Sequence, residues 1–171
     1  DFSNDPTSTL QIGGNNPQPW VETGGNPGGF LAITYPVGSQ YTGFVFPDID
    51  DGKIITAFNF QADLRVGNST GDRAADGFSI SIARANDPLL EDIGNTANFA
   101  GSIPEGGSKT GIAISFDTWA GNTYSDGGDI EGIVVRVDDK TVLRHSVPTR
   151  HGACDDATSL QTGPWDEQYW A

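Results

Sequence analysis

One stretch of the sequence, residues 111–138, constrains the fold more than any other. Its first half alternates between apolar and other residues: Ile112, Ile114 and Phe116 occupy even positions, whereas Asp117 occupies an odd one. Such alternation predicts a β-strand with one face toward a core. Asp117 then lies on the face opposite the apolar side chains, because an unpaired carboxylate among them would be very costly.

A loop rich in oxygen atoms follows this strand, and a second strand is expected over 130–137. Two strands joined by an acidic loop can cage calcium, which takes about six to eight oxygen ligands in irregular geometry. The alternative is a solvated turn, since Asp, Asn and Gly are common turn residues. The EF-hand pattern is absent. The candidate ligands are Asp117, the Trp119 carbonyl, Asn122, Asp126 and Asp129.

The composition limits the classes of partner. The chain of 171 residues is long enough for one domain with a sizeable core, and its formal net charge is -14. Such an acidic surface argues against binding to nucleic acid or anionic membranes. No apolar run approaches the ~18 residues of a membrane span. We therefore expect a secreted, extracellular or cell-surface domain without membrane insertion.

Short strands and turns dominate the remaining sequence. The 23 glycines and 10 prolines indicate an all-β sandwich or jelly roll. One helical turn is expected after Asp87-Pro88, because proline is favoured at a helix start. Within a single domain, 1–171, an irregular lead-in spans 1–27 and a loop with an aromatic end spans 149–171. Strands are expected over 28–35, 42–46, 53–66, 76–84, 112–117, 130–137 and 140–147.

The clearest alternation lies in residues 53–66. Phe58, Phe60 and Leu64 share one parity with other apolar residues, whereas Asn59 and the remaining polar residues share the other. This pattern is typical of a half-buried antiparallel strand.

Three segments carry motifs in a distinctive order: RAADGFSISIA at 73–83, EGGSKTG at 105–111 and IAISFDTWAGN at 112–122. Together they resemble the L-type (legume-lectin-like) domain of the concanavalin A-like lectin/glucanase superfamily. The resemblance covers roughly residues 28–147. It implies a concanavalin A-like jelly-roll sandwich of two antiparallel sheets. Family domains are usually longer, so further strands are either missing here or supplied by another chain.

The resemblance implies a sugar site on loops at the rim of the concave sheet. Asp76 accepts hydrogen bonds from sugar hydroxyls after a cis peptide bond, and an Asn bridges metal and sugar. Glycine N–H groups donate, since no Cβ keeps the sugar away. An aromatic ring covers the apolar face of the sugar. The implied carbohydrate-binding residues are Asp76, Gly106, Gly107, Asn122, Trp119 and Tyr124.

Calcium is the cofactor that the resemblance implies. The sequence departs from the family pattern at the residues that bind a second metal in plant members. Plant members bind a transition-type metal through a Glu two residues before the metal Asp, where this chain has Ser115. We therefore expect no second metal. The family's His in the next strand is also missing, and Glu131 is its nearby replacement. Asp126 and Asp129 compete for the last calcium position.

These features predict a calcium-dependent carbohydrate-binding module and not an enzyme. A first alternative is a structural or adhesive sandwich that assembles through sheet edges, as the acidic surface and the single Cys154 suggest. A second is a glycoside hydrolase, which needs two facing carboxyl groups. On related folds these come from Glu residues two or four apart on one strand, and no Glu here has that spacing.

Overall fold

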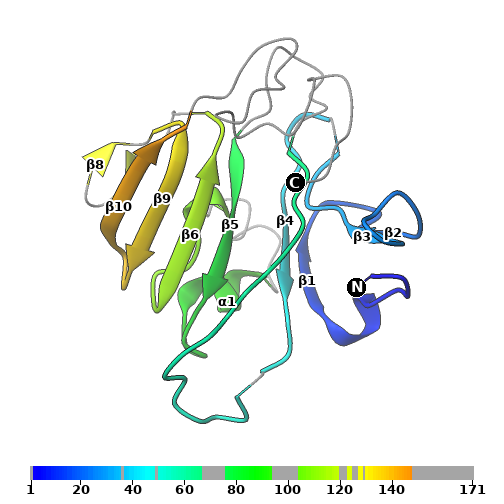
Figure 1. Ribbon diagram of the computed structural model, residues 1–171, viewed down its shortest axis with the longest axis horizontal. Helices are drawn as coiled ribbons and strands as arrows, with labels where there is room; N and C mark the ends of the chain where they lie inside the picture. The colour runs from blue at the N-terminus through cyan, green and yellow to red at the C-terminus, as the bar shows by residue number, and fades with distance from the viewer. Residues whose placement is uncertain are drawn as a thin grey trace.

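The computed structural model describes residues 2–35, 37–48, 50–66, 76–93, 104–119, 123–124, 127–128 and 130–147. This part of the chain is mainly β, and all its paired strands are antiparallel (Figure 1). The strands are β1 (Gln11–Gly14), β2 (Trp20–Val21), β3 (Phe30–Leu31), β4 (Thr42–Val45), β5 (Gly77–Ile82), β6 (Ile112–Asp117), β7 (Thr123–Tyr124), β8 (Gly127–Gly128), β9 (Gly132–Val137) and β10 (Lys140–Ser146). The helical elements are α1 (Pro88–Ile93) and the 3-10 turns η1 (Thr7–Thr9) and η2 (Pro104–Gly106).

The largest sheet has the strand order β10-β9-β6-β5. Its two middle strands come from the 111–138 stretch, so the prediction that this stretch forms two strands joined by a loop is confirmed. The loop between them contains the short β7–β8 pair. Ser115 of β6 lies between Ser79 of β5 and Val134 of β9, and this register fixes which side chains share a face.

The two faces of this sheet differ in chemistry and in burial. One face carries Phe78, Ile114, Phe116 and other apolar side chains, and these are only partly buried. The Phe78 and Phe116 rings stack on this face with centroids 4.8 Å apart. The opposite face, which we call the polar face, contains the most buried residues of the sheet, although its two β5 serines are only partly buried. Its members are Ser79, Ser81, Ala113, Ser115, Asp117, Val134 and Arg136.

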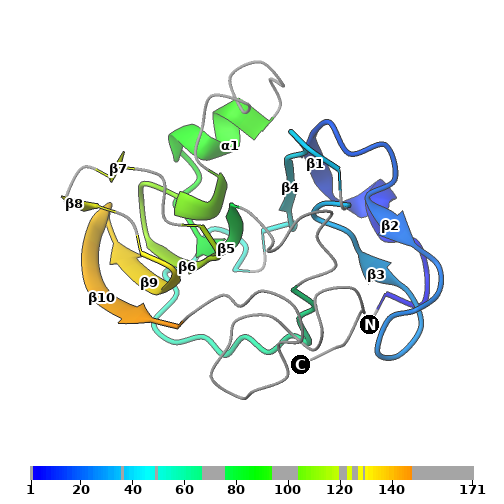
Figure 2. The same cartoon turned by 90° about the horizontal axis from the view of Figure 1, so that it is seen from above.

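Residues 104–108, which we call the η2 segment, cover the polar face. Gly107 has φ +75, and a Cβ added there would lie 2.8 Å from both Ala113 Cβ and Ser81 Oγ. The small side chains of this face therefore let a backbone segment approach closely. Figure 2 shows η2 on one side of the sheet and the 50–66 segment on the other. Asp117 does lie opposite the apolar set, as predicted, but the polar face is the more buried one.

Several strand predictions were wrong. Residues 53–66 form no strand, and Ile54 is 91% exposed. The predicted strand 28–35 is reduced to β3, and the lead-in 1–27 contains both β1 and β2. Alternation identifies a possible face, but a strand also needs neighbouring N–H and C=O partners, which a local pattern does not reveal.

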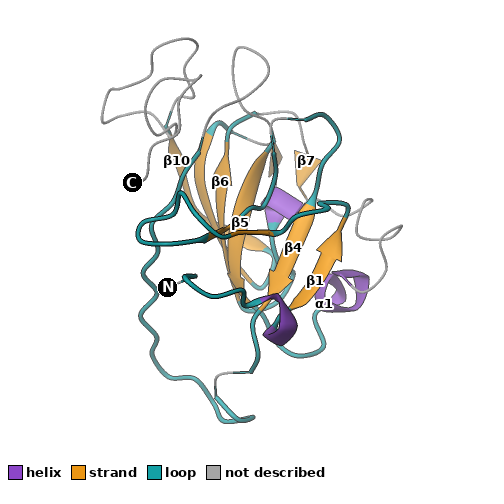
Figure 3. Ribbon diagram, turned by 90° about the vertical axis from the view of Figure 1, so that its right-hand side faces the viewer, coloured by secondary structure: helices purple, strands orange, loops and turns teal. Residues whose placement is uncertain are grey.

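The remaining strands and the helix agree with the sequence. β4, β5 and β10 lie within their predicted ranges, and α1 begins at Pro88. A separate pair, β1–β4, contacts α1, where the Cα of Gly13 faces Ile93 (Figure 3). Among the described residues, no helix has the length and apolar character needed to cross a bilayer.

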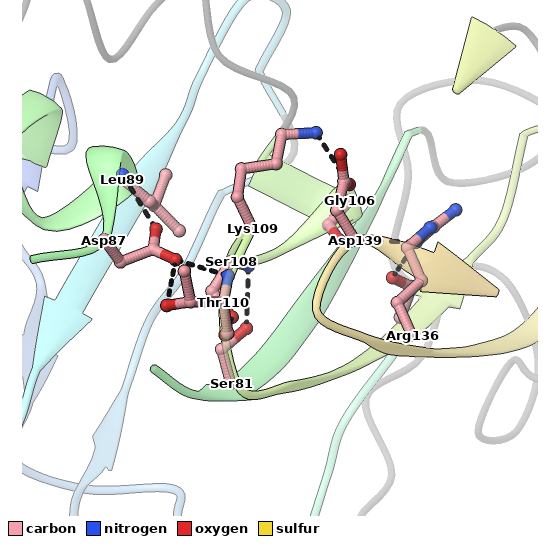
Figure 4. A network of polar contacts seen from close by, with 10 residues as sticks. Ser81, Asp87, Leu89, Gly106, Ser108, Lys109, Thr110, Arg136 and Asp139 are labelled. Carbon is pink, nitrogen blue, oxygen red and sulfur yellow. Dashed lines mark hydrogen bonds and ion pairs between the residues drawn. The ribbon is translucent and has the colours of Figure 1, made fainter. Parts of the chain in front are cut away.

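A network of polar contacts holds the end of the sheet near α1 (Figure 4). The buried Asp87 carboxylate accepts hydrogen bonds from Leu89 N–H at 2.9 Å and from Thr110 N–H at 2.6 Å and Oγ1 at 2.7 Å. On the surface, Arg84 forms a two-bond ion pair with Asp138, at 2.6 and 3.1 Å. These contacts join the helix start, the loop before β6 and the β9–β10 turn.

Candidate functional site

The sheet brings Asp76 and Asp117 together at one end of β5 and β6. Gly77, which follows Asp76, lies opposite Asp117 in the β5–β6 register. Thr118 N–H donates a hydrogen bond of 2.9 Å to the Asp76 carbonyl. Two motifs that are distant in the sequence, ADG and FDT, therefore meet at one point.

Gly77 permits this close approach. Its φ is +146, in a region that side chains rarely adopt. A Cβ on Gly77 would lie 3.0 Å from the Asp117 Cα and closer still to the Phe116 carbonyl oxygen. Glycine after Asp76 is thus required by the packing of the two motifs against each other.

The two aspartates differ in exposure. Asp117 is 0% exposed, whereas Asp76 is exposed to solvent. Asp117 Oδ1 accepts a hydrogen bond of 3.0 Å from Trp119 N–H, which turns the chain away from the strand. Trp119 follows at the surface, with 44% of its area exposed. One carboxylate is therefore enclosed, while the other and an indole ring face solvent.

Thr118 is a member of this site that the sequence did not single out. It is 1% exposed, and within the described part of the chain its Oγ1 makes no hydrogen bond. A buried hydroxyl normally has a partner, because leaving it without one costs free energy. The buried carboxylate of the neighbouring Asp117 provides oxygen atoms of the kind that calcium prefers. The only sequence signal was the position of Thr118 inside the FDT triplet.

Glu131 lies at the same end of the sheet as Asp117. It directly precedes Gly132, the β9 residue that pairs with Asp117. Its carbonyl accepts a hydrogen bond of 3.2 Å from Val147 N–H, and the residue is half-buried. The structure thus places Glu131 beside the strand end that carries the predicted metal residue.

The other predicted metal and sugar residues fall partly outside the described structure. Asn122, Asp126 and Asp129 lie outside the described residues, as does Ala75, so the expected Ala75–Asp76 cis bond does too. The backbone of Tyr124 pairs with Gly127 in the β7–β8 hairpin of the same loop. Among the residues that are described, no group of three His, Cys, Asp or Glu side chains is arranged to hold a metal ion.

Gly106 and Gly107 are both buried in the η2 segment. The Gly106 carbonyl accepts a hydrogen bond of 3.3 Å from Arg136 Nη1, and the Cα of Gly107 faces the sheet. Close packing on the polar face explains the need for glycine at 107. The role of these glycines as donors to a sugar stays a prediction.

Arg136 is the second residue near the site that sequence reasoning missed. It is 2% exposed and lies in the middle of β9 on the polar face. An available signal was its position in GIVVRV, where it shares parity with Val134 and interrupts an apolar strand. A charged residue at such a position is rarely buried without a specific partner.

Comparisons of the chain with protein-family models, with curated proteins and with solved structures find no match.

Proposed function

We propose that this chain is a calcium-dependent carbohydrate-binding, lectin-like module. The observation that carries the proposal is the junction of Asp76 with Asp117 and Thr118 at one end of the sheet. The sequence motifs around these residues resemble those of L-type lectin domains, and the junction supports the arrangement that the resemblance implies.

The exposed groups of this junction suit a sugar. Vicinal hydroxyls donate hydrogen bonds to a fixed carboxylate such as that of Asp76. The C–H face of a pyranose ring can stack on an exposed indole such as Trp119, which is 44% exposed. Displacing water from these groups is favourable only when the hydroxyls are fully paired, and this requirement gives the site its selectivity.

In this proposal calcium is held by the enclosed side of the junction. Asp117 supplies a buried carboxylate, and Asn122 with Asp126 or Asp129 supplies oxygens from the following loop. The Trp119 carbonyl and Glu131 complete the ligand set. When bound, calcium fixes the loop beside Asp76, so sugar binding depends on the metal. The buried hydroxyl of Thr118 supports the presence of a ligand or water at this position.

The proposal includes a fold, a location and the absence of catalysis. The four-stranded sheet is one layer of a concanavalin A-like jelly-roll sandwich. The net charge of -14 suits a secreted or cell-surface protein in a calcium-rich medium. Sugar is bound without hydrolysis, and incubation with polysaccharides should release no reducing ends.

A glycan array in calcium, repeated in EDTA, tests the proposal. We expect binding in calcium and its loss in EDTA. Asp76→Asn should abolish sugar binding and keep the calcium-induced gain in thermal stability, whereas Asp117→Asn should lose both. Asp63→Asn is the matched control, because Asp63 is an exposed aspartate in the 53–66 segment. No binding in either buffer, or binding that ignores EDTA, contradicts the proposal.

The second candidate function is a structural or adhesive module. Exposed apolar side chains on β10 favour it: Val142 is 62% and Leu143 is 50% exposed, and β10 lies at the edge of the sheet that the described residues form. Such an edge can add a strand from another chain. Sedimentation over a range of concentrations should then show assembly that Leu143→Lys reduces, with no sugar bound. A monomer at all concentrations contradicts this second function.

A further inference from the structure

Arg136 is buried in the middle of the four-stranded sheet. It is 2% exposed and lies opposite Ala113 of β6 on the polar face. Removing a guanidinium from water costs several kcal/mol unless its N–H groups find acceptors. The side chain must therefore form specific contacts that favour its burial.

The contacts of Arg136 join three parts of the chain. Its Nη1 donates to Ser115 Oγ at 3.0 Å. The same nitrogen donates to the Gly106 carbonyl at 3.3 Å, and Figure 4 shows Arg136 beside Gly106. The first bond links β9 to β6, and the second links β9 to the η2 segment. Glu105, which precedes Gly106, is also buried at 6% exposure.

The η2 segment is held at a second point farther along. Ser108 N–H donates to Ser81 Oγ at 3.1 Å, and between the two points Gly107 packs on Ala113. Arg136 anchors the beginning of the segment, and Ser81 anchors its end. The anchor formed by Arg136 is the nearer one to the candidate site, because Ser115 precedes Asp117 by two residues on the same face of β6.

We propose that Arg136 is a positioning residue for the candidate site: it fixes the η2 segment on the polar face beside Asp117. This inference rests on the proposed function, since the segment contains Gly106 and Gly107, which are predicted to donate to the sugar. Arginine suits the role because the two N–H groups of Nη1 are fixed in the plane of a rigid guanidinium and point toward two acceptors, whereas lysine offers a flexible point charge. Loss of the guanidinium should therefore loosen the segment while leaving Asp117 in place.

The test compares Arg136→Lys with Arg144→Lys by amide hydrogen exchange. Arg144 is an exposed arginine of β10, so this control makes the same chemical change away from the segment. In Arg136→Lys we expect Gly107 and Ser108 amides to exchange about tenfold faster, the equivalent of roughly one lost hydrogen bond. Amides of β9 and β10 should be unchanged, and Arg144→Lys should resemble wild type. Unchanged exchange in the η2 segment overturns the inference.

Binding measurements separate positioning from general stability. In Arg136→Lys we expect the sugar Kd to rise about tenfold, with the calcium Kd within about twofold of wild type. Equal losses of calcium and sugar binding, or faster exchange with unchanged sugar binding, overturn the positioning role. Ser115→Ala, which removes one acceptor and keeps the arginine, should shift both readouts in the same direction if Arg136→Lys fails to fold.

The two proposals fail in different ways. If wild-type protein binds calcium but no array sugar, the proposed function fails and the positioning role fails with it. The exchange experiment would still report whether Arg136 anchors the segment, because it needs no ligand. If wild type binds sugar and the segment does not loosen in Arg136→Lys or Ser115→Ala, only the further inference fails.

Discussion

At the residue scale, two glycines show how the same backbone conformation meets different surroundings. Gly107 has φ +75 and Gly52 has φ +74, so both adopt a left-handed conformation. A Cβ on Gly52 would meet no atom within 4 Å, whereas one on Gly107 would press against Ala113 and Ser81. Substitution of Gly52 therefore measures the cost of the left-handed conformation alone, whereas substitution of Gly107 adds the cost of close packing.

We expect Gly107→Ala to destabilise the fold more than Gly52→Ala. Both substitutions carry the left-handed penalty of roughly 1–2 kcal/mol. Only Gly107→Ala adds overpacking, typically about 1–3 kcal/mol. Urea unfolding of both variants measures the difference in free energy of unfolding. Equal losses would mean that the η2 segment does not pack on the polar face in solution.

A second residue-scale prediction concerns Asp87. Asp87→Ala removes a buried acceptor that caps α1 at Leu89 and pairs with Thr110 N–H and Oγ1. We expect a loss of about 2–3 kcal/mol in the free energy of unfolding. Glu91→Ala, on an exposed position of α1, is the control and should change stability by less than about 0.5 kcal/mol. A small effect of Asp87→Ala in urea unfolding would exclude a structural role for the cap.

At the element scale, the β9–β10 hairpin is closed by Asp138 and Asp139, with φ 48 and 61. Aspartate tolerates this left-handed region, and the two-residue turn fits between the strands expected over 130–137 and 140–147. The hydrogen bond from Arg84, followed by that from Gly111 N–H, lowers the pKa of Asp138 below the ordinary 3.8. The hairpin turn is thereby joined to the loop before β6.

This lowered pKa gives the hairpin a pH dependence. The bonds of ionised Asp138 stabilise the fold above pH 3.8, and this contribution is lost as the pH falls through the lower folded pKa. The effect is small, because the pair is exposed and screened. Asp138→Asn keeps a residue that tolerates positive φ but has no carboxyl group to protonate. The urea midpoint of this variant should therefore fall less than that of wild type between pH 5 and pH 2. An equal fall of the urea midpoint in both proteins would show that the Arg84–Asp138 ion pair contributes nothing to stability.

Residues 53–66 show the limit of element prediction. Alternating apolar residues predicted a strand, but Phe58 and Phe60 are 46% and 57% exposed and the segment has no strand partner in the described structure. By contrast, residues 112–117 and 132–137 form strands because they pair with each other in register, on either side of a connecting loop. Residues 53–66 have the clearest alternation in the chain and yet form no strand, so pairing and not periodicity made the difference.

At the scale of the whole molecule, calcium should act as a stabilising ligand. A ligand that binds only the folded state at about 100 times its Kd adds roughly 2.7 kcal/mol. For a domain of this size that corresponds to a Tm increase of about 5–10 °C. Magnesium at the same concentration controls for screening of the -14 net charge and should give a smaller increase.

Scanning calorimetry of wild type and Asp117→Asn measures this effect. The increase should vanish in Asp117→Asn and persist in Asp76→Asn. A wild-type Tm that is the same in calcium and EDTA would remove the metal from the proposed function.

The sequence alone predicted much of the large sheet. The strands expected over 76–84, 112–117, 130–137 and 140–147 contain β5, β6, β9 and β10, the Asp87-Pro88 pair located α1, and the motif order led to Asp76 and Asp117 as candidate residues. These features depend on neighbours in the chain: strand faces follow a period of two, and a helix start needs only a cap and a proline. The parts of the candidate site that lie on β5 and β6 were therefore predictable.

Only the tertiary structure decided which face of the sheet is buried. From the sequence, the apolar face around Ile114 was the expected core, yet the sheet residues with almost no exposure lie on the opposite face: Ser115, Asp117 and Arg136, together with Ala113 and Val134. The η2 segment covers part of this face, because its glycine allows a backbone to pack on small side chains and its Gly106 carbonyl accepts a hydrogen bond from Arg136. Long-range contacts of this kind leave no periodic signal in the chain, because each partner satisfies the other only after both are folded together.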